Sequence, residues 1–121
     1  MGRSEVDVKI AYINSATGAV TADDVDSSNG NFLDISDMKD DRLAIRIYGG
    51  SGDDWQCTFK AGDLSDSSIG DLEVDIASTE IKVITLESAR FKDTDEYILI
   101  DAATTATSGI TAATLEAYVL N

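Results

Sequence analysis

The stretch from Leu72 to Leu86 alternates between apolar and polar residues with a period of two, which is typical of a β-strand with one buried face. Two strands are predicted here, at residues 72–76 and 81–86, joined by a turn at residues 77–80. We expect them to pair as a hairpin with Val74 opposite Val83 in the core. The second strand is apolar on both sides, so it is expected to be an interior strand with protein packed on each face.

The same period recurs along the chain, and no segment shows a sustained helical period. The remaining predicted strands lie at residues 6–13, 32–35, 42–48, 55–60, 97–101 and 110–120. Glycine-rich or acidic turns separate them. This pattern predicts an all-β fold, a β-sandwich or small β-barrel of seven to eight mostly antiparallel strands. Residues 6–121 are expected to form one domain and residues 1–5 a flexible N-terminal arm.

Acidic residues dominate the charge of the chain, with 23 Asp and Glu against nine Lys and Arg and a net charge of −14. Such a surface repels phosphate backbones and anionic lipids, so nucleic acid and membranes are not expected partners. No apolar run reaches the ~20 residues of a membrane-spanning helix, and the first residues lack the layout of a secretory signal. Synthesis in a cytoplasm is therefore expected.

Catalytic chemistry finds little support in the sequence. There is no histidine, which removes the commonest general base and the usual partner of a nucleophilic serine or cysteine. The single cysteine, Cys57, lies between Trp55 and Phe59 on an alternating strand and is interpreted as a buried apolar side chain. We expect neither enzymatic activity nor a cofactor.

Acidic clusters raise the question of calcium, which prefers carboxylate and carbonyl oxygens. The best candidates are Asp23, Asp24 and Asp26, which precede Ser28, Asn29 and Gly30. The glycine stands one position late for a calcium loop, and an isoleucine occupies the position of the bidentate glutamate. A solvated acidic loop is the preferred interpretation, and no metal site is predicted.

Three groups of residues are candidates for protein contacts. Tyr48 is an aromatic residue on the outward side of its strand, beside Arg46. Ala113 and Ala117 are small residues on the last strand and are interpreted as a contact with a neighbouring subunit. The third group is the arm, which is free to order against a partner. Its contact residues are Arg3, Ser4 and Glu5.

From Arg42 onward, over about two-thirds of the chain, the sequence resembles a group of small tailed-bacteriophage proteins that decorate or stabilise the capsid. The segments that carry the resemblance are RLAIRI, TFKAGD, GDLEVDI and LESARFK, followed by a final apolar strand. The resemblance implies a β-rich virion structural protein, a homotrimer bound to the major capsid protein on the outer surface of the head shell. It also implies that the cytoplasm in which the protein is made is that of a host bacterium.

A second class of function stays open on the residues alone. An acidic β-sandwich without catalytic groups also fits an adhesive or carbohydrate-binding module, with or without bound calcium, on a phage tail or a bacterial surface. A trimer that adds to expanded capsids would favour the first function, whereas affinity of the free monomer for glycan or calcium would favour the second.

Overall fold

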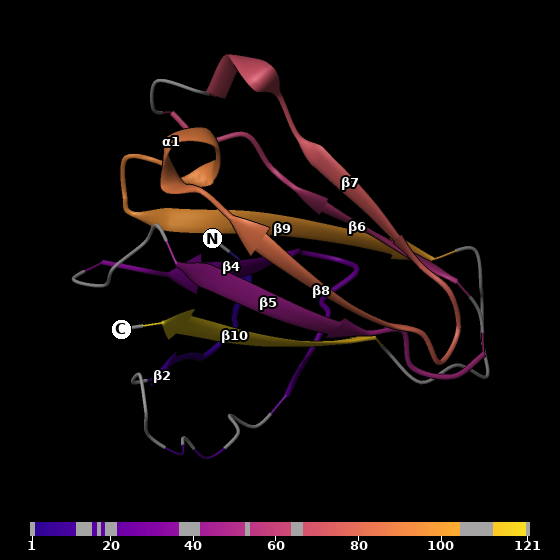
Figure 1. Cartoon of the computed structure of the whole chain (residues 1–121). Coiled ribbons are helices and arrows are strands. Elements are labelled where there is room, and N and C mark those ends of the chain that lie inside the picture. The colour runs from indigo at the N-terminus through magenta and orange to yellow at the C-terminus, as the bar shows by residue number, and fades with distance from the viewer. Residues whose placement is uncertain are drawn as a thin grey trace.

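The protein is a sandwich of two five-stranded β-sheets in the computed structural model (Figure 1). The structure describes residues 2–11, 16, 18, 22–36, 42–52, 54–63, 67–104 and 113–120. The first sheet has the order β1 (Ser4–Glu5), β4 (Asn31–Asp34), β9 (Tyr97–Thr104), β6 (Trp55–Phe59) and β7 (Leu72–Ile76). The second has the order β2 (Val8–Ala11), β10 (Thr114–Leu120), β5 (Leu43–Tyr48) and β8 (Ile81–Leu86), and β3 (Asp23–Asp24) also pairs with β10.

In the part of the chain that the structure describes, helix is confined to a 3-10 turn, η1 (Ser67–Ile69), and one short α-helix, α1 (Ser88–Phe91). Two strand pairs are parallel, β1 with β4 and β2 with β10, and the other pairs are antiparallel. The sheets do not close into a barrel, so the prediction of an all-β sandwich is confirmed. The two-residue strands β1 and β3 are additional to the predicted set, because so short a segment carries no period that a sequence could reveal.

The hydrophobic core lies between the sheets, where the inward side chains of alternating strands meet. Its largest fully buried members come from both sheets and neighbouring loops: Val6, Leu33, Ile35, Leu43, Ile45, Ile47, Phe59, Ile76, Ile98, Ile100, Leu115 and Val119. Cys57 is also fully buried, as expected, and burial raises the pKa of its thiol to about 11. The thiol therefore stays protonated at neutral pH and is not a nucleophile.

The predicted hairpin at residues 72–86 is wrong. Both strands form at the predicted positions, but β7 pairs with β6 in the first sheet and β8 pairs with β5 in the second. The turn between them therefore crosses from one sheet to the other (Figure 1). It packs against Gly49, where a Cβ atom would collide with the carbonyl oxygen of Ala77.

The side chains of β8 also face opposite to the prediction. Val83 is 65% exposed, whereas Leu86 is buried and Ile84 packs partly against the core. Lys82 points inward with them, and its amine donates a hydrogen bond to the carbonyl oxygen of Asp75 at 2.6 Å. The strand lies at the edge of its sheet, not in the interior. A strand that is apolar on both sides does not reveal which side is buried, and this is why the prediction failed.

The expected loose arm is attached to the first sheet over residues 3–5. The backbone N–H of Ser4 donates to the carbonyl oxygen of Gly30 at 3.0 Å, and Ser4–Glu5 pair with β4 as β1. Arg3 donates from Nη1 to the carbonyl oxygens of Asn31 and Ile100, at 3.2 and 3.0 Å. These partners are far away in the sequence, so the local composition that predicted a flexible arm could not reveal them.

Candidate interaction surface

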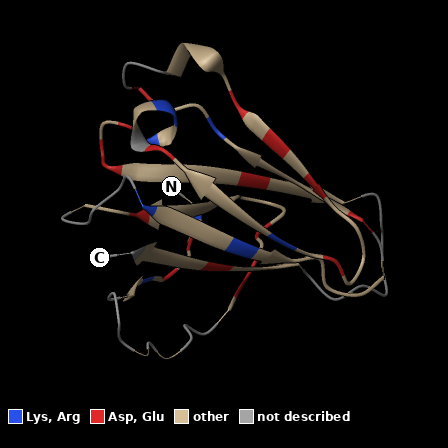
Figure 2. Ribbon diagram, viewed as in Figure 1, with Lys and Arg blue, Asp and Glu red and all other residues tan. Residues whose placement is uncertain are grey.

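The outer face of the first sheet is acidic. Its strands direct five acidic side chains outward and, among the described residues, no basic one. Figure 2 marks acidic positions in red along the ribbon. The acidic residues are Glu5, Asp34, Glu73, Asp75 and Asp101. Arg3, which precedes β1, forms an ion pair with Asp101 at 2.8 Å. This face would repel another acidic surface.

The outer face of the second sheet has a different character. We call it the second-sheet face and define it by the outward residues of β2, β10, β5 and β8: Lys9, Ala44, Arg46, Tyr48, Ile81, Val83, Thr85, Thr114, Glu116 and Tyr118. It carries two basic side chains and one acidic one, and Asp24 of β3 lies at its margin. In a chain of net charge −14, this face can approach an acidic partner without strong repulsion.

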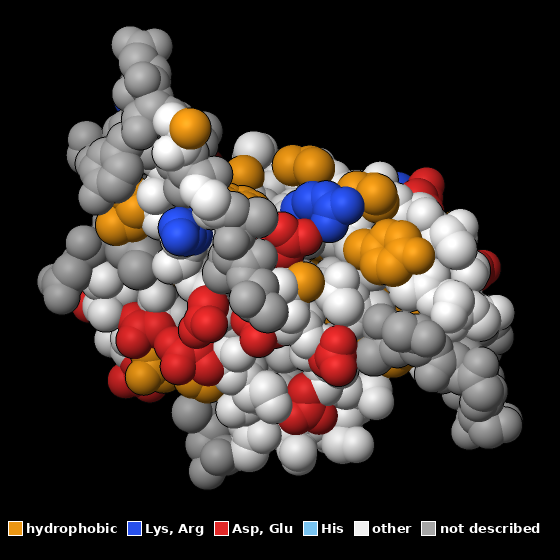
Figure 3. All heavy atoms as spheres, turned by 90° about the horizontal axis from the view of Figure 1, so that it is seen from below, with side chains coloured by type: hydrophobic (Ala, Val, Ile, Leu, Met, Phe, Trp, Pro, Cys, Tyr) orange, Lys and Arg blue, Asp and Glu red, His pale blue; other side chains and the backbone are white. Residues whose placement is uncertain are grey.

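An ion pair between β5 and β10 lies within this face. Arg46 is directly opposite Glu116 in the sheet, with Nη1 2.6 Å from Oε2, and Tyr118 donates its hydroxyl to Oε1 at 2.9 Å. The glutamate side chain is only 14% exposed. Both oxygens of Glu116 therefore have partners. Seen from below in Figure 3, one face of the molecule shows hydrophobic side chains beside basic and acidic ones.

Exposed apolar side chains line the β8 side of the second-sheet face. Ile81 is 50% exposed and Val83 is 65% exposed. Ile81 lies opposite Tyr48 and Val83 opposite Arg46 in the β5–β8 ladder. An exposed apolar group with a polar rim is typical of a protein-binding surface.

Tyr48 lies on the outward side of its strand, as the sequence predicted, and is partly exposed at the end of β5 between Ile81 and Thr114. The sequence analysis missed Ile81 and Val83 as surface residues, since it assigned them to the core. The available signal was the apolar character of both sides of this strand, which also fits an edge strand whose outer side meets a partner.

Ala113 and Ala117 do not lie on the surface. Both are fully buried, on the same inward side of the last strand as Leu115 and Val119. Small residues do allow a second layer to pack there, but this layer is the first sheet of the same chain. The prediction that they contact a neighbouring subunit is therefore wrong.

The acidic loop considered for calcium is organised by hydrogen bonds to its carboxylates. Asp26 accepts the backbone N–H groups of Asn29 and Ser28 and the hydroxyl of Ser4, at 2.9, 3.1 and 2.8 Å. These hydrogen bonds hold the pKa of Asp26 below its usual value, and the bond from the backbone of Asn29 has the largest effect. A carboxylate of Asp23 accepts the backbone N–H of Asp7 at 3.0 Å.

The carboxylates of Asp23 and Asp26 thus accept hydrogen bonds from backbone N–H groups. Within the described ranges no group of three or more acidic or cysteine side chains is arranged to hold a metal ion. Gly30, at the end of this loop, has a φ of +82° and touches Arg3, so it needs to be glycine.

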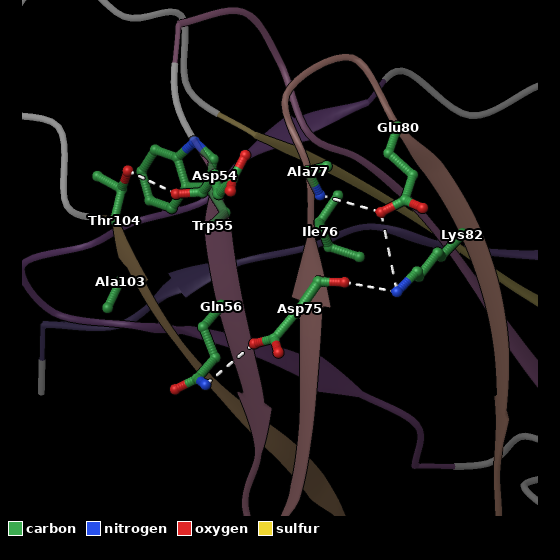
Figure 4. Close-up of a pocket in the computed structure, with 10 residues that line it drawn as sticks. All are labelled: Asp54, Trp55, Gln56, Asp75, Ile76, Ala77, Glu80, Lys82, Ala103 and Thr104. Carbon is green, nitrogen blue, oxygen red and sulfur yellow. Dashed lines mark hydrogen bonds and ion pairs between the residues drawn. The ribbon is translucent and has the colours of Figure 1, made fainter.

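A shallow cavity of about 600 Å³ lies at one end of the first sheet (Figure 4). Its polar side chains mostly bind one another: Gln56 donates to Asp75 at 3.1 Å, and the amine of Lys82 lies 3.8 Å from Glu80. The indole N–H of Trp55 is buried without a hydrogen-bond partner in the described part of the chain. The cavity offers acceptors and donors for a polar ligand but no nucleophile with an adjacent base.

Comparisons with known proteins identify no relative: no family model matches the chain, and neither does any curated protein or solved structure. Among the described residues no helix is long and apolar enough to cross a membrane.

Proposed function

We propose that this protein is a virion structural subunit that binds through its second-sheet face to the outer surface of a tailed-phage head shell. The phage assignment rests on the sequence resemblance from Arg42 onward. The resemblance also implies that the partner is the major capsid protein and that the binding unit is a trimer. Both remain predictions.

The observation that carries the proposal is the difference between the two outer faces. The first sheet is acidic on its outside, whereas the second-sheet face combines balanced charge with exposed Ile81, Val83 and Tyr48. A subunit present in many copies has to stay soluble before it assembles, which a high net charge favours. It also needs one face that tolerates close contact, and the second-sheet face supplies this combination.

The test is co-sedimentation of the purified protein with expanded phage heads that lack a decoration protein. Tyr48→Asp places a charge in the second-sheet face, and we expect binding to fall at least tenfold. Thr58→Asp is the matched control, because Thr58 is a partly exposed, outward strand residue of the first sheet. We expect this variant to bind like the unaltered protein.

Three results would overturn the proposal in different ways. Failure of the unaltered protein to co-sediment with any such head would remove the decoration function. Equal loss of binding by both variants, with circular dichroism showing an intact fold, would mean that binding is not confined to the second-sheet face. Loss of binding with Thr58→Asp alone would show that the contact with the head lies on the first sheet.

The cavity beside Trp55 favours the second candidate, a carbohydrate-binding module. Planar polar side chains such as Asp75 and Gln56 can bind sugar hydroxyls, and the Trp55 side chain lines the same cavity. Binding of free glycans to the dilute protein, abolished by Gln56→Ala, would support this function. Co-sedimentation with heads that is insensitive to glycans would support the first.

A further inference from the structure

Strand β8 presents unpaired backbone groups at the edge of the second sheet. Gly49 donates its N–H to the carbonyl oxygen of Glu80 at 2.8 Å, in register with the β5–β8 ladder. Because hydrogen-bonded and non-bonded pairs alternate in an antiparallel ladder, the N–H and C=O groups of Ile81, Val83 and Thr85 point away from β5. The same three residues also have exposed side chains.

No described strand pairs with this edge, since β7 belongs to the other sheet. Figure 1 shows β7 and β8 diverging from the turn that joins them. The other edges are protected: β1 has two residues, β7 carries Glu73 and Asp75 on its outer side, and β2 carries Lys9. The outer side of β8, with Ile81, Val83 and Thr85, carries no charge over six residues.

We propose that the edge of β8 binds β8 of a second copy of this chain, antiparallel and across a two-fold axis at Val83. In this register Val83 faces its own counterpart and Ile81 faces Thr85 of the other copy, so that the free backbone groups bond to each other. Lys82 then lies opposite Ile84 and Glu80 opposite Leu86, so like charges are not directly opposed. The paired sheets form one continuous sheet of eight main strands.

The register points to a second copy as the occupant because β8 is complementary to itself in it, and the charges around β8 tolerate this contact. Two chains of net charge −14 repel each other over most of their surfaces, including the acidic outer face of the first sheet. The β8 edge adjoins the second-sheet face, where two basic residues and one acidic residue lie. Two copies can therefore meet there with little repulsion. Edge pairing also leaves the second-sheet face open and doubles its width.

This contact generates a dimer, whereas the sequence resemblance implies a trimer. It does not depend on the proposed function, because it is a property of the free protein. Co-sedimentation with phage heads could fail while the dimer forms, and the dimer could be absent while the protein binds heads.

Sedimentation equilibrium of the purified protein tests the contact. We expect a monomer–dimer equilibrium in which Val83→Lys raises the dissociation constant at least tenfold, because it places two like charges face to face on the axis. Ala103→Lys is the control: it adds the same charge at an exposed strand position of the first sheet and should leave the constant within about twofold.

A mixture of Val83→Lys and Val83→Glu gives the result specific to a two-fold axis at this residue. We expect the two variants to associate with each other more tightly than either does with itself, and less so at high salt. A protein that stays monomeric at the highest soluble concentration would overturn the proposal, and so would a trimer, or dimerisation unaffected by Val83→Lys. If the protein is monomeric and an extended segment of another protein binds at this edge, that segment, and not a second copy, is the partner of β8.

Discussion

Replacing Arg3 by alanine should destabilise the whole domain, although the residue lies near the chain end. Its guanidinium donates to the carbonyl oxygens of Asn31 and Ile100 and forms an ion pair with Asp101. The side chain of Arg3 is 20% exposed, so water replaces these contacts poorly. The variant would leave two backbone carbonyl oxygens of the first sheet without this partner.

The expected loss follows from typical energies of such contacts. Hydrogen bonds to a charged group contribute about 1.5–3 kcal/mol. The ion pair adds less than about 1 kcal/mol, because the Asp101 side chain is 47% exposed. All three contacts are made by Nη1, which has only two N–H groups, so their energies do not add and we expect a loss of about 2 kcal/mol. An unfolding entropy of about 2.1 cal/mol/K per residue gives roughly 0.25 kcal/mol/K for this chain, so Tm should fall by about 8 °C.

Differential scanning calorimetry of Arg3→Ala and Arg42→Ala measures this effect. Arg42 is exposed just before β5, so its replacement removes the same charge and should shift Tm by less than about 2 °C. A variant that begins at Val6 should be destabilised at least as much as Arg3→Ala. Equal Tm values for the two arginine variants would refute the attachment of residues 3–5 to the first sheet.

In dilute solution, Val83→Asp should change the free energy of unfolding, measured in urea, by less than about 0.5 kcal/mol. Ile84 faces the core, so Ile84→Asp should lower this free energy by about 3 kcal/mol. The reverse order would restore the sequence-based assignment of the two faces of β8. Cys57 in the native protein should react with a thiol reagent at pH 8 far more slowly than Cys57 in the urea-unfolded protein. Because the pKa of this thiol rises from 9.0 to about 11 on folding, the stability of the protein should fall as the pH rises through this range. The lowered pKa of Asp26 contributes stability above pH 3.8 that is lost as the pH falls below it, and Asp26→Asn should flatten this part of an acid titration. EDTA and millimolar calcium should both leave Tm unchanged, and a rise of several degrees with calcium would identify a metal site that the carboxylate geometry does not suggest.

The strands and most of their inward faces could be predicted because each strand has one polar and one apolar side. Leu43, Ile45 and Ile47, for example, alternate with Ala44 and Arg46 and are buried as expected. It was harder to predict which strands pair with each other, because a four-residue turn can join two strands of one sheet or strands of two different sheets. Here the turn lies against Gly49, and this contact between distant segments cannot be recognised from the local pattern.

The candidate surface was only partly predictable for the same reason. Tyr48 was identified because its strand alternates clearly, whereas Ile81 and Val83 lie on a strand that is apolar on both sides. The misassignment of Ala113 and Ala117 has a related cause. Their strand shows which residues share a face but not whether the layer against that face belongs to the same chain.

Hydroxyl-radical footprinting of the protein free and bound to expanded phage heads tests most directly whether the second-sheet face is the binding surface. Tyr48 and Tyr118 lie on this face, and Phe32 and Tyr97, whose ring centroids are 4.8 Å apart, lie on the outside of the first sheet. All four rings are partly exposed in the free protein. We expect oxidation of Tyr48 and Tyr118 to fall severalfold on binding while that of Phe32 and Tyr97 stays unchanged. Protection of Phe32 and Tyr97 with unaltered oxidation of Tyr48 and Tyr118 would contradict the account.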